Sequence, residues 1–68
     1  MNLRIGKKVH YTPFEGCDDS LIENGVIKSH SDDLETVFVV YKCNDDWKNY
    51  ANYTGCSTRI EDLKEGWI

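Results

Sequence analysis

The sequence predicts one small all-β domain, built as a sandwich or barrel of short strands. Its 68 residues leave room for one small core, because a chain of this size buries only about 60% of the surface that it exposes when unfolded. Hydrophobic residues make up 40% of the chain and charged residues 29%, which is a globular profile rather than a disordered one. Turn signals recur about every eight to twelve residues, and this spacing favours short strands.

The first strand is expected near the N-terminus. Val9 and Tyr11 would face one side of it. Lys8 and His10 would face the other, which gives the period-two pattern of a half-buried strand. The strand should end before Pro13, because proline cannot donate a hydrogen bond to a ladder.

The stretch after this strand is expected to be a loop that contains one short helical turn. It is too polar and too often interrupted by glycine for a strand, whereas Ser20 and Glu23 have the spacing of a capping box, which opens a helical turn. Asn24 and Gly25 tolerate positive φ, so they should end the turn and lead into a second strand over residues 26–29.

The middle of the chain carries the clearest strand signal. A hairpin loop is expected over residues 30–35, followed by a strand over 36–42 that is β-branched and aromatic and apolar on both faces, as expected of a central strand. Residues 43–52 are expected to form an extended loop and residues 53–58 a fourth strand, with Gly55 at a bulge or a barrel corner.

The pattern is less regular towards the C-terminus. Ile60 would begin a fifth short strand or extended segment, and residues 62–64 before Gly66 would form a helical turn that closes one end of the barrel with Leu63. Four strands are therefore predicted from the pattern, whereas the fifth depends mainly on a resemblance.

That resemblance is carried by Gly-x-x-Val at residues 6–9, Asn-Gly-Val-Ile at 24–27, Val-Phe-Val-Val-Tyr at 37–41 and Asp-Leu at 62–63. The order of elements resembles the SH3-like barrels of Tudor and KOW type over nearly the whole chain. It implies a single five-stranded SH3-like barrel over residues 1–68, with one or two short helical turns. Tudor domains bind methylated Lys or Arg in an aromatic cage, and KOW-type barrels bind RNA or protein through basic loops. No residue of this chain is assigned to either motif.

Residues 9–17, 23–25, 37–41 and 62–67 are similar to those of small proteins carried by phages and prophages. That family has no established activity. The resemblance implies a chain of phage or prophage origin, which would act in the host cytoplasm.

Composition excludes several classes of function. The net charge of −4 argues against a general phosphate-binding surface, because nucleic-acid backbones are bound largely through Lys and Arg. No apolar run approaches the roughly 20 residues that span a bilayer, and no signal peptide is recognised, so we expect no membrane partner and a cytoplasmic location. Cys17, Cys43 and Cys56 match neither a CxxC pair nor a disulfide framework, so we expect reduced thiols and no metal or other cofactor.

The aromatic residues of the third loop are the candidate binding residues. Trp47, Tyr50 and Tyr53 recur at a spacing of three and could form one exposed ridge. Beside Asp45 and Asp46, such a ridge would suit a cationic group or a peptide that contains Lys or Arg, since ring faces and carboxylates both attract cations. Alternatively, the same rings fold back to cover an open end of the barrel and complete its burial.

No arrangement of residues for catalysis is recognised, so an enzyme is not expected. We expect a non-catalytic module that binds protein or peptide through the third loop together with the long first loop around Phe14. Tyr11, Phe38 and Tyr41 fit the strand pattern and are interpreted as structural. Two alternatives stay open: stacking of single-stranded nucleic acid on the aromatic rings, and a structural role in which an exposed edge strand makes a homo-oligomer.

Overall fold

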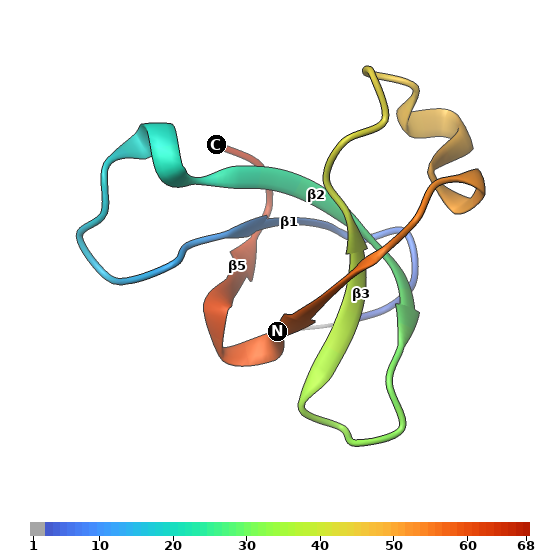
Figure 1. The fold of residues 1–68 in the computed structure, drawn as a ribbon, viewed down its shortest axis with the longest axis horizontal. Coiled ribbons are helices and arrows are strands. Elements are labelled where there is room, and N and C mark those ends of the chain that lie inside the picture. The colour runs from blue at the N-terminus through green and yellow to red at the C-terminus, as the bar shows by residue number, and fades with distance from the viewer. Residues whose placement is uncertain (1–2) are drawn as a thin grey trace.

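The computed structural model describes residues 3–68, which form one five-stranded antiparallel sheet with short 3-10 turns (Figure 1). The strands are β1 (Lys8–Tyr11), β2 (Glu23–His30), β3 (Thr36–Val40), β4 (Cys56–Arg59) and β5 (Leu63–Glu65). The 3-10 turns are η1 (Asp19–Leu21), η2 (Trp47–Asn52) and η3 (Ile60–Asp62). The prediction of a mostly-β chain is therefore confirmed.

The strands follow the order β4-β3-β2-β1-β5, and every neighbouring pair is antiparallel. β1 thus lies between β2 and β5, although β5 comes last in the sequence. β2 bends as it passes from β1 to β3 (Figure 1), and a register shift between Ile27 and Ser29 marks an irregularity of the β-bulge kind, which bends a strand. β4 and β5 are the two edges of the sheet. No ladder joins them among the described residues, so the predicted closed barrel is not confirmed.

One face of the sheet, the inner face, carries the hydrophobic core. Val9, Ile27 and Val39 are completely buried there. Val37 from β3 and Leu63 from β5 complete the cluster. Because burial of a Val, Leu or Ile side chain contributes about 1.5–3 kcal/mol, these few residues supply much of the stabilisation of so small a protein.

Gly25 allows close packing across the inner face. It lies within β2, opposite Val9 of β1. A Cβ atom at this position would lie 2.6 Å from Val39 Cγ1 and 2.9 Å from Tyr41 Cδ1, which is too close for carbon atoms. The expectation that Gly25 ends a turn before the second strand is wrong, because the strand already begins at Glu23. What glycine provides here is space for its neighbours.

The opposite, outer face of the sheet carries a second apolar cluster. Val26 and Val40 are paired neighbours on this face, and only 4% and 0% of their surface is exposed. The Trp67 ring lies over this part of the sheet, because its Nε1 donates a hydrogen bond to the Gly25 carbonyl oxygen at 2.8 Å. Trp47 packs against Trp67 with ring centroids 4.8 Å apart. The prediction that β3 is buried on both faces is confirmed.

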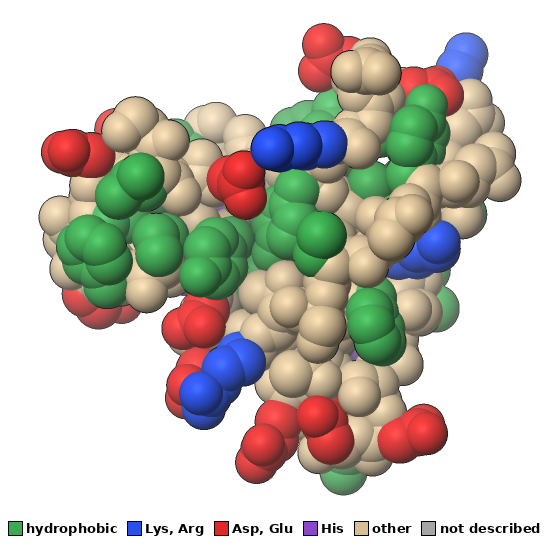
Figure 2. All heavy atoms as spheres, viewed as in Figure 1, with side chains coloured by type: hydrophobic (Ala, Val, Ile, Leu, Met, Phe, Trp, Pro, Cys, Tyr) green, Lys and Arg blue, Asp and Glu red, His purple; other side chains and the backbone are tan. Residues whose placement is uncertain are grey.

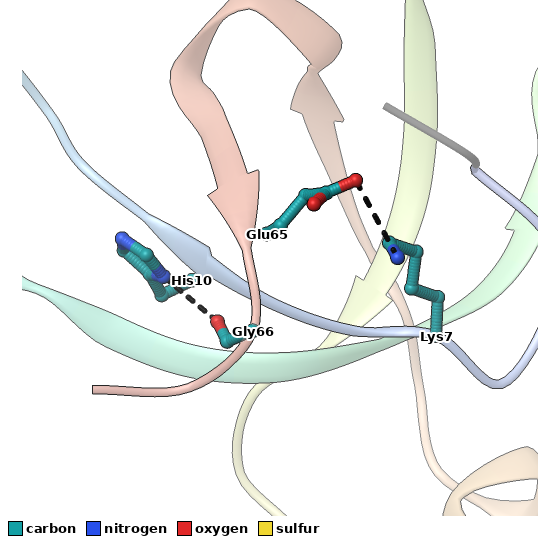
Figure 3. Close-up of polar contacts among 4 residues, drawn as sticks. All are labelled: Lys7, His10, Glu65 and Gly66. Atoms are coloured by element: carbon teal, nitrogen blue, oxygen red, sulfur yellow. Dashed lines mark hydrogen bonds and ion pairs between the residues drawn. The ribbon is translucent and has the colours of Figure 1, made fainter.

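The C-terminal segment is fixed to the sheet by hydrogen bonds. The Gly66 N–H donates to the Lys8 carbonyl oxygen at 2.9 Å. His10 is buried and its Nδ1 donates to the Gly66 carbonyl oxygen at 2.7 Å (Figure 3). The Asn24 side chain bonds both main-chain groups of Ile68, at 3.1 Å each. These bonds hold the tryptophan that follows Gly66 over the outer face.

The turns differ in detail from the sequence-based expectations. The short turn expected at Ser20 is present as η1, but its N-cap is Asp18 without a side-chain cap bond, and Glu23 already belongs to β2. The predicted capping box is therefore wrong. Residues 47–52, expected as extended loop, form η2. Near the C-terminus the expected order is reversed, because η3 comes first and the strand covers residues 63–65.

Asp33 closes the hairpin loop between β2 and β3. Its Oδ1 accepts hydrogen bonds from the Glu35 N–H at 2.9 Å and the Thr36 N–H at 3.0 Å. These bonds favour the ionised carboxylate and lower the pKa of Asp33. Asp commonly stabilises turns in this way, and the predicted hairpin is confirmed.

Replacing Trp47 with Ala should destabilise the protein, because it uncovers Trp67 and the outer-face cluster. Trp47 is half-buried, so we expect a loss of about 2 kcal/mol, below the roughly 3–5 kcal/mol of a fully buried aromatic residue. Urea denaturation followed by circular dichroism measures the change. The exposed neighbour Lys48→Ala is the control, with a change of less than about 0.5 kcal/mol. Unchanged stability of Trp47→Ala would show that the ring is free to serve a ligand.

Candidate functional site

The inner face continues past the core into an open groove, here named the tyrosine groove. The Tyr11 and Tyr41 rings meet in it edge to face, with centroids 6.2 Å apart and planes at 68°. Its volume of about 360 Å³ falls within the roughly 300–1,000 Å³ of ligand pockets. The other lining residues come from β2, β4 and η3 and are Glu23, Cys56, Ser57, Thr58, Arg59 and Asp62.

Strand register explains why these side chains meet. Side chains alternate along a strand, so Tyr11 lies on the same face as Val9, and Glu23 is its direct partner in β2. Tyr41 follows Val39 by two residues and packs over the space that glycine leaves in β2. Residues distant in sequence therefore come together at one end of the inner face.

The Tyr41 hydroxyl connects the groove to the edge strand β4. It forms a hydrogen bond of 2.8 Å with Thr58 Oγ1, and Thr58 Oγ1 also donates to the Cys56 carbonyl oxygen at 3.2 Å. Burial is the main cause that raises the pKa of Tyr41 from 10.0 to about 12. The phenol therefore stays neutral near pH 7 and fixes the position of its ring against β4.

The charged groups of the groove are mainly acidic. Glu23 is exposed. Asp62 is held in place, because its carbonyl oxygen accepts a hydrogen bond from the Thr12 N–H at 3.0 Å. Arg59 lies 2.6 Å from the Glu61 carboxylate, which balances its charge. The groove thus combines carboxylates with tyrosine rings, and both attract cations.

Apolar side chains extend from the first long loop towards the groove. In Figure 2 they gather over the loop between β1 and β2 and continue to the middle of the molecule, where β4 crosses in Figure 1. Phe14 and Leu21 of this loop are 59% and 49% exposed. The loop connects Tyr11 to Glu23, so it begins and ends at residues that line the groove. Grouped exposed apolar residues of this kind mark interaction sites.

The three aromatic residues predicted as a ridge lie in and beside η2, away from the groove lining. Trp47 packs against Trp67. The Tyr53 hydroxyl donates a hydrogen bond to Asp46 at 3.0 Å, and this bond raises the pKa of Tyr53. Tyr50 is also half-buried, and within residues 3–68 no ring contact joins the three. Their role as a binding site stays a prediction.

The remaining predicted site residues lie in two places. Asp45 is exposed in a turn where it and Asn44 both have positive φ. Asp46 accepts a second hydrogen bond, from Asn49 Nδ2 at 2.9 Å, and so belongs to the local structure of η2. Of the predicted residues, Phe14 is the one on the loop that adjoins the tyrosine groove.

The sequence pattern does not predict that the groove residues form a binding site. Tyr11 and Tyr41 fit their strands, and the pattern alone does not distinguish a strand residue in the core from one at its open end. A usable signal was present: each tyrosine follows a core valine by two residues and stands at or just beyond the last residue of its strand. Glu23 carried no signal, because its partner depends on the register of β1 and β2.

The basic residues near the N-terminus lie around a second hollow of about 590 Å³. They are largely engaged within the protein. Lys7 Nζ lies 3.6 Å from the Glu65 carboxylate (Figure 3), and Lys8 Nζ lies 4.6 Å from the centre of the Trp67 ring. These contacts reduce the positive charge that this hollow could offer to a phosphate.

Metal-ligating groups, cysteines and apolar helices would indicate other kinds of site. No three His, Cys, Asp or Glu side chains gather as a possible metal site within residues 3–68. The cysteines are unpaired, with Cys43 buried, Cys17 half-buried and Cys56 exposed. No helix in the described part of the chain is long and apolar enough to cross a membrane.

The chain matches no protein-family model, no curated protein and no solved structure. The chemistry of the groove is inferred from its own groups, which are two tyrosine rings, two carboxylates and the residues of an edge strand.

Tyr41 should keep its proton well above pH 10. Its pKa is raised to about 12 in the folded protein, whereas the unfolded chain releases this proton near the ordinary value. The unfolded state therefore loses the proton first, and the free energy of unfolding should fall as the pH rises from 10 to 12. Titration of phenolate absorbance measures the pKa. Tyr41→Phe should remove the step near 12, and an unchanged titration curve in this variant would contradict the burial.

Proposed function

We propose that this chain is a non-catalytic binding module that holds a protein or peptide segment in the tyrosine groove. The observation that carries the proposal is the meeting of the Tyr11 and Tyr41 rings with two acidic residues, Glu23 and Asp62, in the lining of one open groove. Aromatic faces and carboxylates both attract the ammonium group of Lys and the guanidinium group of Arg. The ligand is therefore a segment that carries a basic side chain.

The first long loop supports a protein ligand rather than a small cation. Phe14 and Leu21 expose apolar surface on the loop that joins Tyr11 to Glu23, and covering such surface by a partner is favourable. A segment with an apolar residue next to its Lys or Arg would use the loop and the groove together. Loops held by a rigid sheet are common places for such sites.

The finer fold assignment, an SH3-like barrel, is part of the same proposal. It is supported by the strand order, in which β1 pairs with both β2 and β5, and by the short turn η3 that leads directly from β4 to β5. The likeness to Tudor and KOW barrels and to phage proteins is proposed on the sequence resemblance alone.

Selection of short linear peptides displayed on phage, with the folded protein as the target, tests the proposal. The selected peptides should be enriched in Lys or Arg. Glu23→Gln removes a carboxylate from an exposed position of the groove without changing its shape, so it should weaken binding by about tenfold, equivalent to about 1.4 kcal/mol. Fluorescence anisotropy of a labelled selected peptide measures the Kd.

The matched control is Asp45→Asn, which removes one carboxylate from the third loop. Asn tolerates the positive φ of this position, so the fold should be unaffected and binding should stay within about threefold of wild type. Binding that survives Glu23→Gln and is lost in Asp45→Asn would move the site to the third loop. Failure to select any peptide would contradict the proposal.

A further inference from the structure

We infer that the ligand binds as an added β-strand along the free edge of β4 and places a Lys or Arg side chain in the tyrosine groove. This inference rests on the proposed function and specifies its geometry. β4 is an edge strand, and an unpaired edge presents N–H and C=O groups to any extended chain beside it. All four residues of β4 line the tyrosine groove, so the edge and the groove are one surface.

The register of β4 against β3 shows which main-chain N–H and C=O groups of β4 form no hydrogen bond with β3. In an antiparallel pair, hydrogen-bonded and non-hydrogen-bonded positions alternate. The Ile60 N–H donates to the Glu35 carbonyl oxygen at 2.9 Å, directly beyond the last pair of the ladder, Thr36 with Arg59. The alternation therefore turns the main-chain groups of Arg59 away from β3, and those of Ser57 likewise.

The same alternation turns the main-chain groups of Cys56 and Thr58 towards β3, where they pair with Val39 and Val37. Their side chains lie on the inner face, because successive side chains of a strand point to opposite faces and their partners belong to the core. The free edge of β4 thus offers two N–H and two C=O groups, from Ser57 and Arg59.

A strand added at this edge would lie about 4.8 Å from β4. Every second side chain of that strand would point to the inner face, next to Thr58 and the Tyr41 hydroxyl that it bonds. A long basic side chain at such a position can reach the tyrosine rings and the Glu23 carboxylate, since these line the same groove. Main-chain bonds would supply affinity, and the groove would select the cation.

Charge complementarity favours a basic segment of another protein over a second copy of this chain. β4 contains one charged residue, Arg59, and its guanidinium lies against Glu61. A second β4 strand would therefore bring no unbalanced cation to the groove. Each copy also carries a net charge of −4, so two copies repel each other at low salt.

Amide hydrogen exchange, followed by NMR with and without a peptide selected on the folded protein, tests this geometry. In the free protein the amides of Cys56 and Thr58 should exchange slowly and those of Ser57 and Arg59 rapidly. Saturating peptide should slow exchange at Ser57 and Arg59 by about tenfold or more, while Cys56 and Thr58 change less.

Methylation of single backbone nitrogens of the same peptide provides a second readout that leaves the protein unchanged. Methyl groups on the nitrogens that face β4 should weaken binding by about tenfold or more, and those on the alternate nitrogens should have little effect, because only one set donates to the edge. The expected result is a period-two pattern along the peptide.

Three other results would overturn the inference. Binding that depends on Glu23 but leaves Ser57 and Arg59 rapidly exchanging would keep the proposed function and exclude the added strand. Protection of Ser57 and Arg59 that rises with protein concentration, without peptide, would assign the edge to a second copy. A peptide that binds without dependence on Glu23 and without protecting β4 would contradict both proposals.

Discussion

The pairing of β1 with β5 brings the two ends of the described chain together, since Val9 lies opposite Glu65 and Tyr11 opposite Leu63. Three other parts of the structure depend on this pairing. It places Leu63 in the inner-face core, it leads the chain to the point where Trp67 covers the outer face, and it fixes η3 next to the end of β1. Without it, each face of the sheet would lose part of its cover.

The groove follows from the same arrangement. β1 has strand partners on both edges, whereas among the described residues β4 has a strand partner on the side of β3 alone. The inner face is therefore left open between β4 and the end of β1. The core residues cover only part of the inner face, and Tyr11 and Tyr41 lie between this core and the open groove. In a larger protein another element could cover these rings. Here the Tyr11 and Tyr41 rings stay half-exposed beside two acidic residues. Ring faces and acidic groups both attract cations, so these two tyrosines can contribute to a cation site as well as to the fold.

Strands that depend on the local residue pattern can be predicted from the sequence. Features that depend on contacts between residues distant in sequence cannot. The alternation around Val9 and the β-branched and aromatic run from Val37 to Val40 correctly predict β1 and β3, because burial imposes period two or continuous apolarity on a strand. The pattern wrongly predicts Gly25 in a turn, because the constraint on this residue is the close approach of Val39 and Tyr41, which are distant in sequence. The pattern predicts a strand before a turn in this region, the reverse of the observed order, because β5 is only three residues long and is stabilised by its pairing with β1.

The site shows the same limit. The spacing of Trp47, Tyr50 and Tyr53 marks a cluster in sequence, but it carries no information on Trp67, the ring that packs against the first of them. Tyr11 and Tyr41 are thirty positions apart, and only the register of β1, β2 and β3 brings their rings together. The sequence thus shows that aromatic residues are important. Only the fold shows which of them are structural and which line the groove.

Chemical-shift mapping of the ¹⁵N-labelled protein with a selected basic peptide tests most directly whether the tyrosine groove is the binding site. The account predicts that the largest shifts fall on Tyr11, Glu23 and residues 56–59, with smaller changes over the outer face. Shifts confined to residues 45–53, with the groove unchanged, would contradict it and place the ligand on the third loop.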